Sequence, residues 1–175
     1  MRLSGLSWLL IGSLSLAPRL AAQAPGNASL SVAELYSLYG KRHDMTIAFA
    51  NLGVARGADG DVRKAAENLV RAHREARDKL ERIATDRHLT LIPPEHDTTT
   101  VLLAQARSTL EGKVGRSFDS TWVNLAHNWL STLILDNNLN VKAHMGPDPQ
   151  PLAREHTTWL FHQSADMDKL RRKFK

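Results

Sequence analysis

The clearest pattern in this chain covers residues 61–88, where hydrophobic and polar positions alternate with the period of an α-helix. At about 100° per residue, one face of this segment is apolar and the opposite face is charged. The apolar face carries Val62, Ala66, Leu69, Ala76, Leu80, Ile83 and Ala84. His73 lies near the centre of that face. A helix this long must bury its apolar face against other helices, so the pattern predicts a helical bundle.

The preceding segment predicts a second long helix. Residues 31–56 begin with a Ser-x-x-Glu sequence, Ser31 to Glu34, which matches the capping box of a helix start. Apolar residues then recur along the segment at helical spacing. The turn at 57–60 is short and contains two glycines, so the two helices should lie side by side and antiparallel.

The rest of the chain shows three more helical patterns and no strand pattern. Pro93 and Pro94 cannot lie inside a helix, so residues 89–95 predict an extended link. Ser117 is expected to cap the helix that follows it. The expected elements are a short helix at 98–110, a long helix at 118–137, a weakly structured loop at 137–149 and a last helix at 151–172. The predicted fold class is therefore all-α, an up-and-down four-helix bundle with one extra short helix.

The N-terminus has the pattern of an export signal. Arg2 gives a weak positive start, and the apolar stretch 6–16 is too short to span a bilayer. Small residues then offer a cleavage site after Ala22. We expect a signal peptide at 1–22, a flexible lead at 23–30 and the helical-bundle domain at 31–175. The alternative is an uncleaved N-terminal anchor. Export of this kind predicts a periplasmic or secreted bacterial protein.

Composition bears on how the bundle is stabilised and on whether the protein binds nucleic acid. The 175-residue chain contains no cysteine, so packing must hold the bundle without disulfides. The formal charge is +5, and loss of Arg2 and Arg19 with the signal peptide leaves 21 basic against 18 acidic residues, a net charge of +3. This excess is too mild to indicate a nucleic-acid partner.

A basic cluster ends the chain and suggests one weak contact. It comprises Lys169, Arg171, Arg172, Lys173 and Lys175. One interpretation is contact with an anionic membrane or a cell-wall polymer. The other is that these residues stay solvated and complement the negative end of the last helix dipole.

Several polar side chains fall on helix faces that should be buried. They are Arg42, His73, His156 and Gln163, with Asp166 at the margin of its face, and His43 lies about 80–100° round the helix from Arg42. His43 and His73 are nearly equidistant from the 57–60 turn, so an antiparallel hairpin should bring them to similar height. One hypothesis is a buried polar network whose members satisfy one another and fix helix register. The other is a metal or haem site between the helices, because neutral imidazole is a common ligand.

Two stretches of the sequence carry a resemblance to a known family. The first runs from Asp61 through His73 and continues to Pro93, and the second runs from Ser117 to His127. Over residues 36–167 the chain resembles the domain of unknown function 4142, a ferritin-like helical-bundle family of exported bacterial proteins. The family has no settled biochemical role, so the resemblance implies fold and compartment rather than activity.

The resemblance also implies candidate site residues. The recurring histidines of the family map to His73 and His127. The family usually has a third histidine in the last helix. That position holds Asp166 in this chain, and the nearest histidine lies one turn earlier. Where the first helix of the family carries acidic residues, this chain has Thr46 and Ala48, which are poor metal ligands. The implied metal set is His73, His127, Asp166 and His162.

Known catalytic motifs are absent from the sequence. A di-iron carboxylate centre needs a Glu-x-x-His motif on each of two helices, and the chain contains none. Phosphate-binding loops and hydrolase or metalloprotease motifs are missing too. We therefore expect an exported cell-envelope bundle with a binding or structural role, without catalysis and without a cofactor. The alternative is a metal-binding or redox bundle that holds a transition metal through interhelical histidines.

Overall fold

The computed structural model describes residues 30–92, 98–141 and 150–174. Within these ranges the chain forms helices and no strand, which confirms the predicted all-α class. The helices are α1 (Val32–Arg56), α2 (Gly60–Asp86), α3 (Thr99–Leu110), α4 (Gly115–Asp136) and α5 (Gln150–Arg172), with a π-helical turn η1 (Asn137–Val141) after α4. None of these helices is both long and apolar enough to cross a bilayer.

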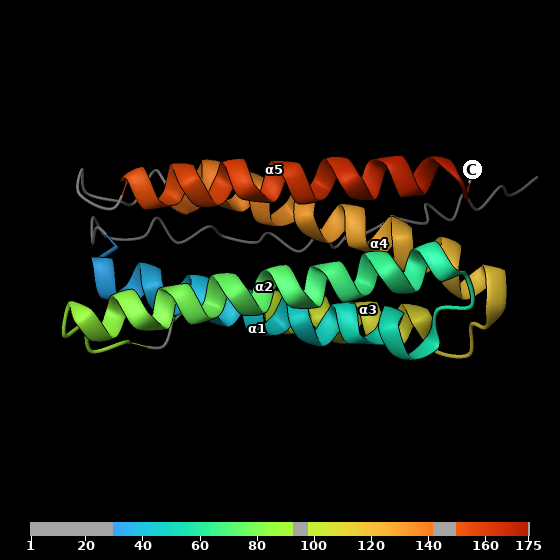
Figure 1. Cartoon of the computed structure of the whole chain (residues 1–175), viewed down its shortest axis with the longest axis horizontal. Helices are drawn as coiled ribbons and strands as arrows, with labels where there is room; N and C mark the ends of the chain where they lie inside the picture. The colour runs from blue at the N-terminus through green and yellow to red at the C-terminus, as the bar shows by residue number, and fades with distance from the viewer. Residues whose placement is uncertain (1–29, 93–97, 142–149, 175) are drawn as a thin grey trace, which may run out of the picture.

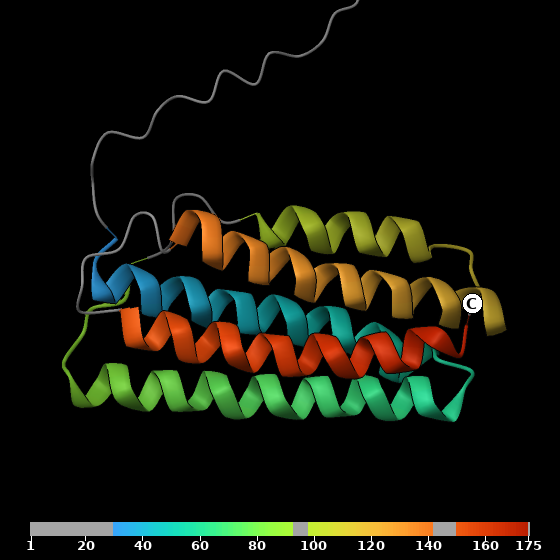
Figure 2. The ribbon, with the colours of Figure 1, turned by 90° about the horizontal axis from the view of Figure 1, so that it is seen from above.

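The helices form a bundle in which each one reverses the direction of the helix before it (Figures 1 and 2). Two antiparallel hairpins, α1–α2 and α4–α5, make the four long helices of the bundle. The short α3 packs against α1 and α4 on the outside (Figure 2). This arrangement leaves α2 and α5 as neighbours along one side, and the candidate site lies between them.

Local chemistry explains the starts of the first two helices. At α1, the Ser31 side chain accepts a hydrogen bond from the Glu34 backbone N–H, and the Glu34 carboxylate accepts one from the Ser31 backbone N–H at 2.8 Å. At α2, the Asp59 side chain caps the helix by accepting from the Asp61 backbone at 2.8 Å. Both contacts satisfy amides that have no partner within the helix.

The start of α4 differs from its predicted position. The helix begins at Gly115, so Ser117 lies inside it, and the Ser117 carbonyl accepts a hydrogen bond from the Thr121 hydroxyl at 2.8 Å. Gly112 and Gly115 both have positive φ angles, at 69° and 54°. These conformations, which glycine adopts without strain, reverse the chain early enough for the helix to start before the serine.

The core is built around stacked aromatic rings. The Phe49 ring lies parallel to Trp122 at 5.5 Å and to Trp129 at 5.1 Å between ring centroids. All three side chains are buried, so the two tryptophans of α4 belong to the core. They join α1 to α4 and so fix the two hairpins against each other.

The end of α4 also departs from prediction, because residues 137–141 form η1 where a loop was expected. Asn137 is completely buried there and donates a hydrogen bond to the Ala153 carbonyl of α5 at 3.0 Å. This hydrogen bond to α5 stabilises the helical turn. It depends on the tertiary structure, so the local sequence does not predict it. The expected signal peptide at 1–22, Pro93 and Pro94 of the expected link, and residues 142–149 of the expected loop lie outside the described residues.

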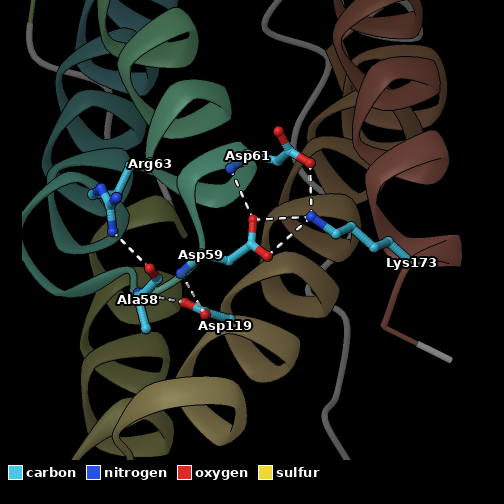
Figure 3. A network of polar contacts seen from close by, with 6 residues as sticks. All are labelled: Ala58, Asp59, Asp61, Arg63, Asp119 and Lys173. Carbon is cyan, nitrogen blue, oxygen red and sulfur yellow. Dashed lines mark hydrogen bonds and ion pairs between the residues drawn. The ribbon is translucent and has the colours of Figure 1, made fainter.

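A polar network locks the opposite end of the bundle (Figure 3). The buried Asp119 carboxylate accepts hydrogen bonds from the backbone amides of Ala58 at 2.9 Å and Asp59 at 2.8 Å. The ammonium of Lys173, directly after the end of α5, pairs with Asp59 at 2.9 Å and with Asp61 at 2.7 Å. Three helices therefore meet at the α1–α2 turn.

Candidate functional site

Three buried imidazoles meet inside the bundle. His43 comes from α1, His73 from α2 and His156 from α5, and their exposed fractions are 1%, 1% and 8%. The Nδ1 atoms of His43 and His73 are 2.9 Å apart. The His43 ring also meets the His156 ring edge-on, with centroids 5.1 Å apart. The predicted equal height of His43 and His73 is therefore confirmed.

Aromatic rings close around this histidine cluster (His43, His73 and His156). The Trp159 ring of α5 lies 5.5 Å from His43 and 4.7 Å from His73 between centroids. The Tyr39 ring of α1 stacks on His156 at 4.0 Å. These contacts hold the imidazoles in place and shield them from water.

A buried polar layer adjoins the cluster. Arg42 of α1 forms an ion pair with Asp136 at the end of α4. The Tyr39 hydroxyl donates a hydrogen bond to the Asn137 side chain, whose amide donates in turn to Thr157. The layer links α1, α4, η1 and α5, and of the residues predicted to satisfy one another in a buried network only Arg42 belongs to it. Of the residues proposed for that network, Gln163 is half-buried and Asp166 is exposed.

Burial keeps the imidazoles in their neutral form. Burial lowers the pKa of His43 to about 4. The pKa of His73 falls well below its usual value through burial, and then through repulsion by His43 and His156. The pKa of His156 falls for the same main reason, with added repulsion from His43 and Arg42. A neutral imidazole has one nitrogen that donates and one that accepts or binds a metal.

Several buried nitrogen atoms of this region lack a hydrogen-bond partner. They are the Nε2 atoms of His43, His73 and His156, and the Nε and Nη1 atoms of Arg42. Leaving a buried polar atom unpaired costs about 1–3 kcal/mol. A guest or ordered water that supplied the missing partners would therefore be bound favourably.

A groove leads from the surface to the cluster. It lies between α2 and α5, has a volume of about 580 Å³, and has His43 and His156 in its lining. Its apolar lining residues are Ala72, Ala76, Leu80, Ile83, Leu152 and Trp159. At its edge, Lys79 of α2 and Glu155 of α5 form an ion pair at 2.9 Å. The groove thus combines apolar walls with a few convergent polar groups, the usual make-up of a small-molecule site.

The residues predicted as metal ligands do not gather around the cluster. His73 belongs to it, and the exposed His162 lies at the groove. His127 is half-buried on α4 beside Asn128, and Asp166 is exposed and pairs with Lys169. Over the ranges that the structure describes, no group of three or more His, Asp or Glu side chains is arranged to hold a metal ion. The set stays a prediction without support from this geometry.

Sequence reasoning missed four members of the polar layer, namely Tyr39, Asp136, Asn137 and Thr157. Tyr39 has the spacing of an ordinary core residue, Asp136 and Asn137 stand where a helix was expected to end, and Thr157 is a small polar residue within the last helix. A weak signal existed in the adjacent polar residues that follow the apolar run of α4. Their partners lie far away in the chain, so spacing alone does not pair them.

The comparisons with known proteins agree with the resemblance drawn from the sequence. No curated protein and no solved structure matches this chain. A family model described as a domain of unknown function (DUF4142) matches residues 17–128. The match includes His43, His73 and most of α4, and it ends before α5. Because it covers more than half of the sequence, the chain belongs to the DUF4142 family.

Proposed function

We propose that this protein is an exported helical bundle of the bacterial cell envelope that binds a small guest in the groove between α2 and α5. One observation carries the proposal: the groove of about 580 Å³ reaches buried imidazoles whose Nε2 atoms have no hydrogen-bond partner. A purely structural bundle gains nothing from unpaired buried nitrogens, because an apolar side chain would pack there at lower cost. In a binding protein, a bound guest would supply hydrogen-bond partners for these nitrogen atoms.

The proposed location is supported by the N-terminal sequence. The basic start, the apolar stretch 6–16 and the small residues before position 23 have the order of a signal peptide. Cleavage after Ala22 would release the bundle into the periplasm or the medium. The experiment is N-terminal sequencing of the protein recovered from the periplasm, where a start at Gln23 is expected.

Contact with an anionic surface remains a lesser proposal. The C-terminal basic side chains are paired within the fold: Lys169 with Asp166, Arg171 and Arg172 with Asp168, and Lys173 with Asp59 and Asp61. Because these acidic partners partly neutralise the basic side chains, the cluster attracts an anionic lipid surface less strongly. Salt-sensitive binding to phosphatidylglycerol vesicles, lost on removal of residues 169–175, would support the contact. A nucleic-acid partner is not proposed.

Guest binding can be tested with an apolar probe dye, anilinonaphthalene sulfonate. Ala76 lines the groove, so Ala76→Phe should fill it, whereas Ala165→Phe adds the same ring to an exposed position on α5. We expect saturable binding of one dye per chain to the wild type and to Ala165→Phe, and its loss in Ala76→Phe. Equal dye binding by the two variants would contradict the proposed groove. Circular dichroism checks that both variants stay helical.

The alternative function, a metal-binding or redox bundle, is favoured by one specific observation. The His43 and His73 rings turn the same nitrogen, Nδ1, toward each other. We propose no catalytic step for this site.

A further inference from the structure

We propose that the guest of the groove is an uncharged amphiphile of the alkylphenol type, whose aromatic hydroxyl group binds His43 and His156 while its alkyl chain lies along the aliphatic part of the groove. The inference rests on the proposed function and deepens it, because it names the chemical class that the groove between α2 and α5 selects. It follows from the order in which different side chains succeed one another along the groove.

The groove is long and follows the helix axes. Its α2 lining extends from Ala72 to Ile83, which spans about 16 Å at about 1.5 Å per residue. The α2 and α5 helices run antiparallel (Figure 2), and the Lys79–Glu155 ion pair sets their register beside the groove. An elongated guest therefore fits this space better than a round one.

One end of the groove is aliphatic. Because the helices are antiparallel, residues that follow Lys79 in α2 lie level with residues that precede Glu155 in α5. The lining residues in these positions are Leu80, Ile83 and Leu152. This aliphatic end offers apolar surface for an alkyl chain, which gains by leaving water.

The other end of the groove, the imidazole end, is lined by the rings of His43, His156 and Trp159. The Trp159 ring lies 5.5 Å from His43 and 5.8 Å from His156 between centroids. The α2 helix contributes the small side chains of Ala72 and Ala76 here, which leave room for a flat ring. Aromatic rings favour offset or edge-on contacts with one another. The imidazole end therefore suits an aromatic group.

The hydrogen-bonding groups at this end call for a hydroxyl. The Nδ1 atoms of His43 and His73, 2.9 Å apart, form a hydrogen bond between neutral rings, each of which carries one N–H. The ring that donates has a bare Nε2, and the ring that accepts has an N–H at Nε2. His43 can take either role, and its Nε2 has no partner. A hydroxyl group donates and accepts, so it satisfies this atom in both states.

Charged groups of the groove lie at its mouth. The charged lining residues are Glu75, Lys79 and Glu155, and all three are exposed. The buried Arg42 is not part of the lining, and its charge is paired with Asp136. A carboxylate at the imidazole end would lose its water without gaining a cation, which is costly. A phenol has a pKa of about 10 and stays uncharged at neutral pH.

The hydroxyl has to enter the floor of the groove, because the Nε2 atoms of His43 and His156 are buried. The Trp159 ring is partly exposed and contacts both histidine rings. It is the side chain that must shift to admit the guest, so the tryptophan fluorescence should change on binding.

The test is isothermal titration calorimetry of the untagged mature protein at neutral pH with para-pentylphenol. We expect one molecule per chain. Para-pentylanisole, in which a methyl group replaces the hydroxyl hydrogen, should bind at least about tenfold more weakly. Para-pentylbenzoate, which is charged, should also bind at least about tenfold more weakly. Para-ethylphenol, three methylene groups shorter, should lose at least about tenfold in affinity.

Two variants locate the hydroxyl. His43→Phe and His156→Phe keep a flat ring and remove its nitrogens, so each should reduce the preference for the phenol over the anisole by at least about threefold. His127→Phe is the matched control, because His127 is half-buried on α4 and lies outside the groove lining. It should keep the wild-type preference. Circular dichroism checks that all three variants stay helical.

Three outcomes overturn the inference. One is equal affinity of the wild type for para-pentylphenol and para-pentylanisole, a measurement that does not depend on whether any variant folds. Another is tighter binding of para-pentylbenzoate than of the phenol. The last is the full wild-type preference in folded His43→Phe and folded His156→Phe.

The results also separate this inference from the groove proposal. Dye binding that Ala76→Phe abolishes, together with equal affinity for the phenol and the anisole, would remove the alkylphenol and leave the groove function standing. Equal dye binding by Ala76→Phe and Ala165→Phe would contradict the groove itself, and the alkylphenol inference would fail with it.

Discussion

The carboxylate of Asp119 accepts a hydrogen bond from the backbone N–H of Asp59 at 2.8 Å. The contact ties the second turn of α4 to the turn between α1 and α2 (Figure 3). Asp119 is only 2% exposed, so water cannot easily replace it. The same carboxylate accepts from Ala58, and both bonds are assisted by its charge.

We expect Asp119→Ala to lower the free energy of unfolding by about 3 kcal/mol, because two amides near the bundle end lose a charged acceptor. Asp119→Asn should cost less, since its amide oxygen still serves one of the two donors. Ser117→Ala is the matched control: it changes an exposed side chain in the same turn and should cost less than about 0.5 kcal/mol. Urea unfolding measures all three, and equal stability of Asp119→Ala and Ser117→Ala would exclude the locking role.

The two glycines inside α1 should respond oppositely to alanine. At Gly53 an added Cβ would lie 2.5 Å from Trp122 and 2.9 Å from the Ala66 methyl, so the helices must move apart. We expect Gly53→Ala to destabilise the protein by about 1–3 kcal/mol. At Gly40 nothing lies within 4 Å of such an atom. Gly40→Ala should therefore stabilise α1 by about 0.5–1 kcal/mol. Thermal unfolding gives both signs, and a stabilising Gly53→Ala would refute the tight crossing.

Local physics explains why most of the fold was predictable. The capping box at Ser31 and the glycines of the 57–60 turn act on their nearest neighbours, so they can be read without the tertiary structure. The equal height of His43 and His73 follows from their distances to that turn. The start of α4 and η1 could not be read in this way. The start of α4 depends on the positive φ angles of Gly112 and Gly115. The helical turn η1 depends on the burial of Asn137 against α5.

The site was only partly predictable, because periodicity gives the face of a residue and not its height. His73 and His156 were both placed on buried faces, and the structure confirms this. Which histidine of α5 meets them depends on how the second hairpin slides along the first. That register is set by packing such as the Phe49–Trp129 stack, which joins residues far apart in the chain. His127 lies on α4, which contributes no histidine to the cluster.

We expect the Thr46 hydroxyl to stabilise the fold through its hydrogen bond with the indole of Trp129. It accepts a hydrogen bond from the Trp129 Nε1–H at 2.9 Å, and both side chains are buried. Thr46→Val keeps the shape and removes the acceptor, so we expect a loss of about 1–3 kcal/mol in the free energy of unfolding. Thr46→Ser keeps the hydroxyl and should lose about 0.8 kcal/mol for the missing methyl. If valine were tolerated better than serine, the bond would have no role in stability.

The histidine cluster should make the fold sensitive to acid. Its pKa values are lowered in the folded protein, to about 4 for His43, mainly because burial disfavours the charged ring. The unfolded chain has the ordinary value of about 6.5 and so binds more protons below that pH. The contribution to stability is therefore fully present above pH 6.5 and is lost as the pH falls below it. Arg42 beside the cluster acts in the same direction on His156.

The expected loss is about 1.4 kcal/mol for each pH unit and each histidine below pH 6.5. Urea unfolding between pH 7.5 and 5, with a chelator present to exclude metal binding, measures the slope. His73→Leu removes one of the three buried rings and should reduce the slope by about one third. Gly40→Ala adds no titratable group and should keep the wild-type slope, although it shifts the stability at every pH. A flat profile in the wild type would mean that the imidazoles take up protons without unfolding the bundle, and that water reaches them inside the core.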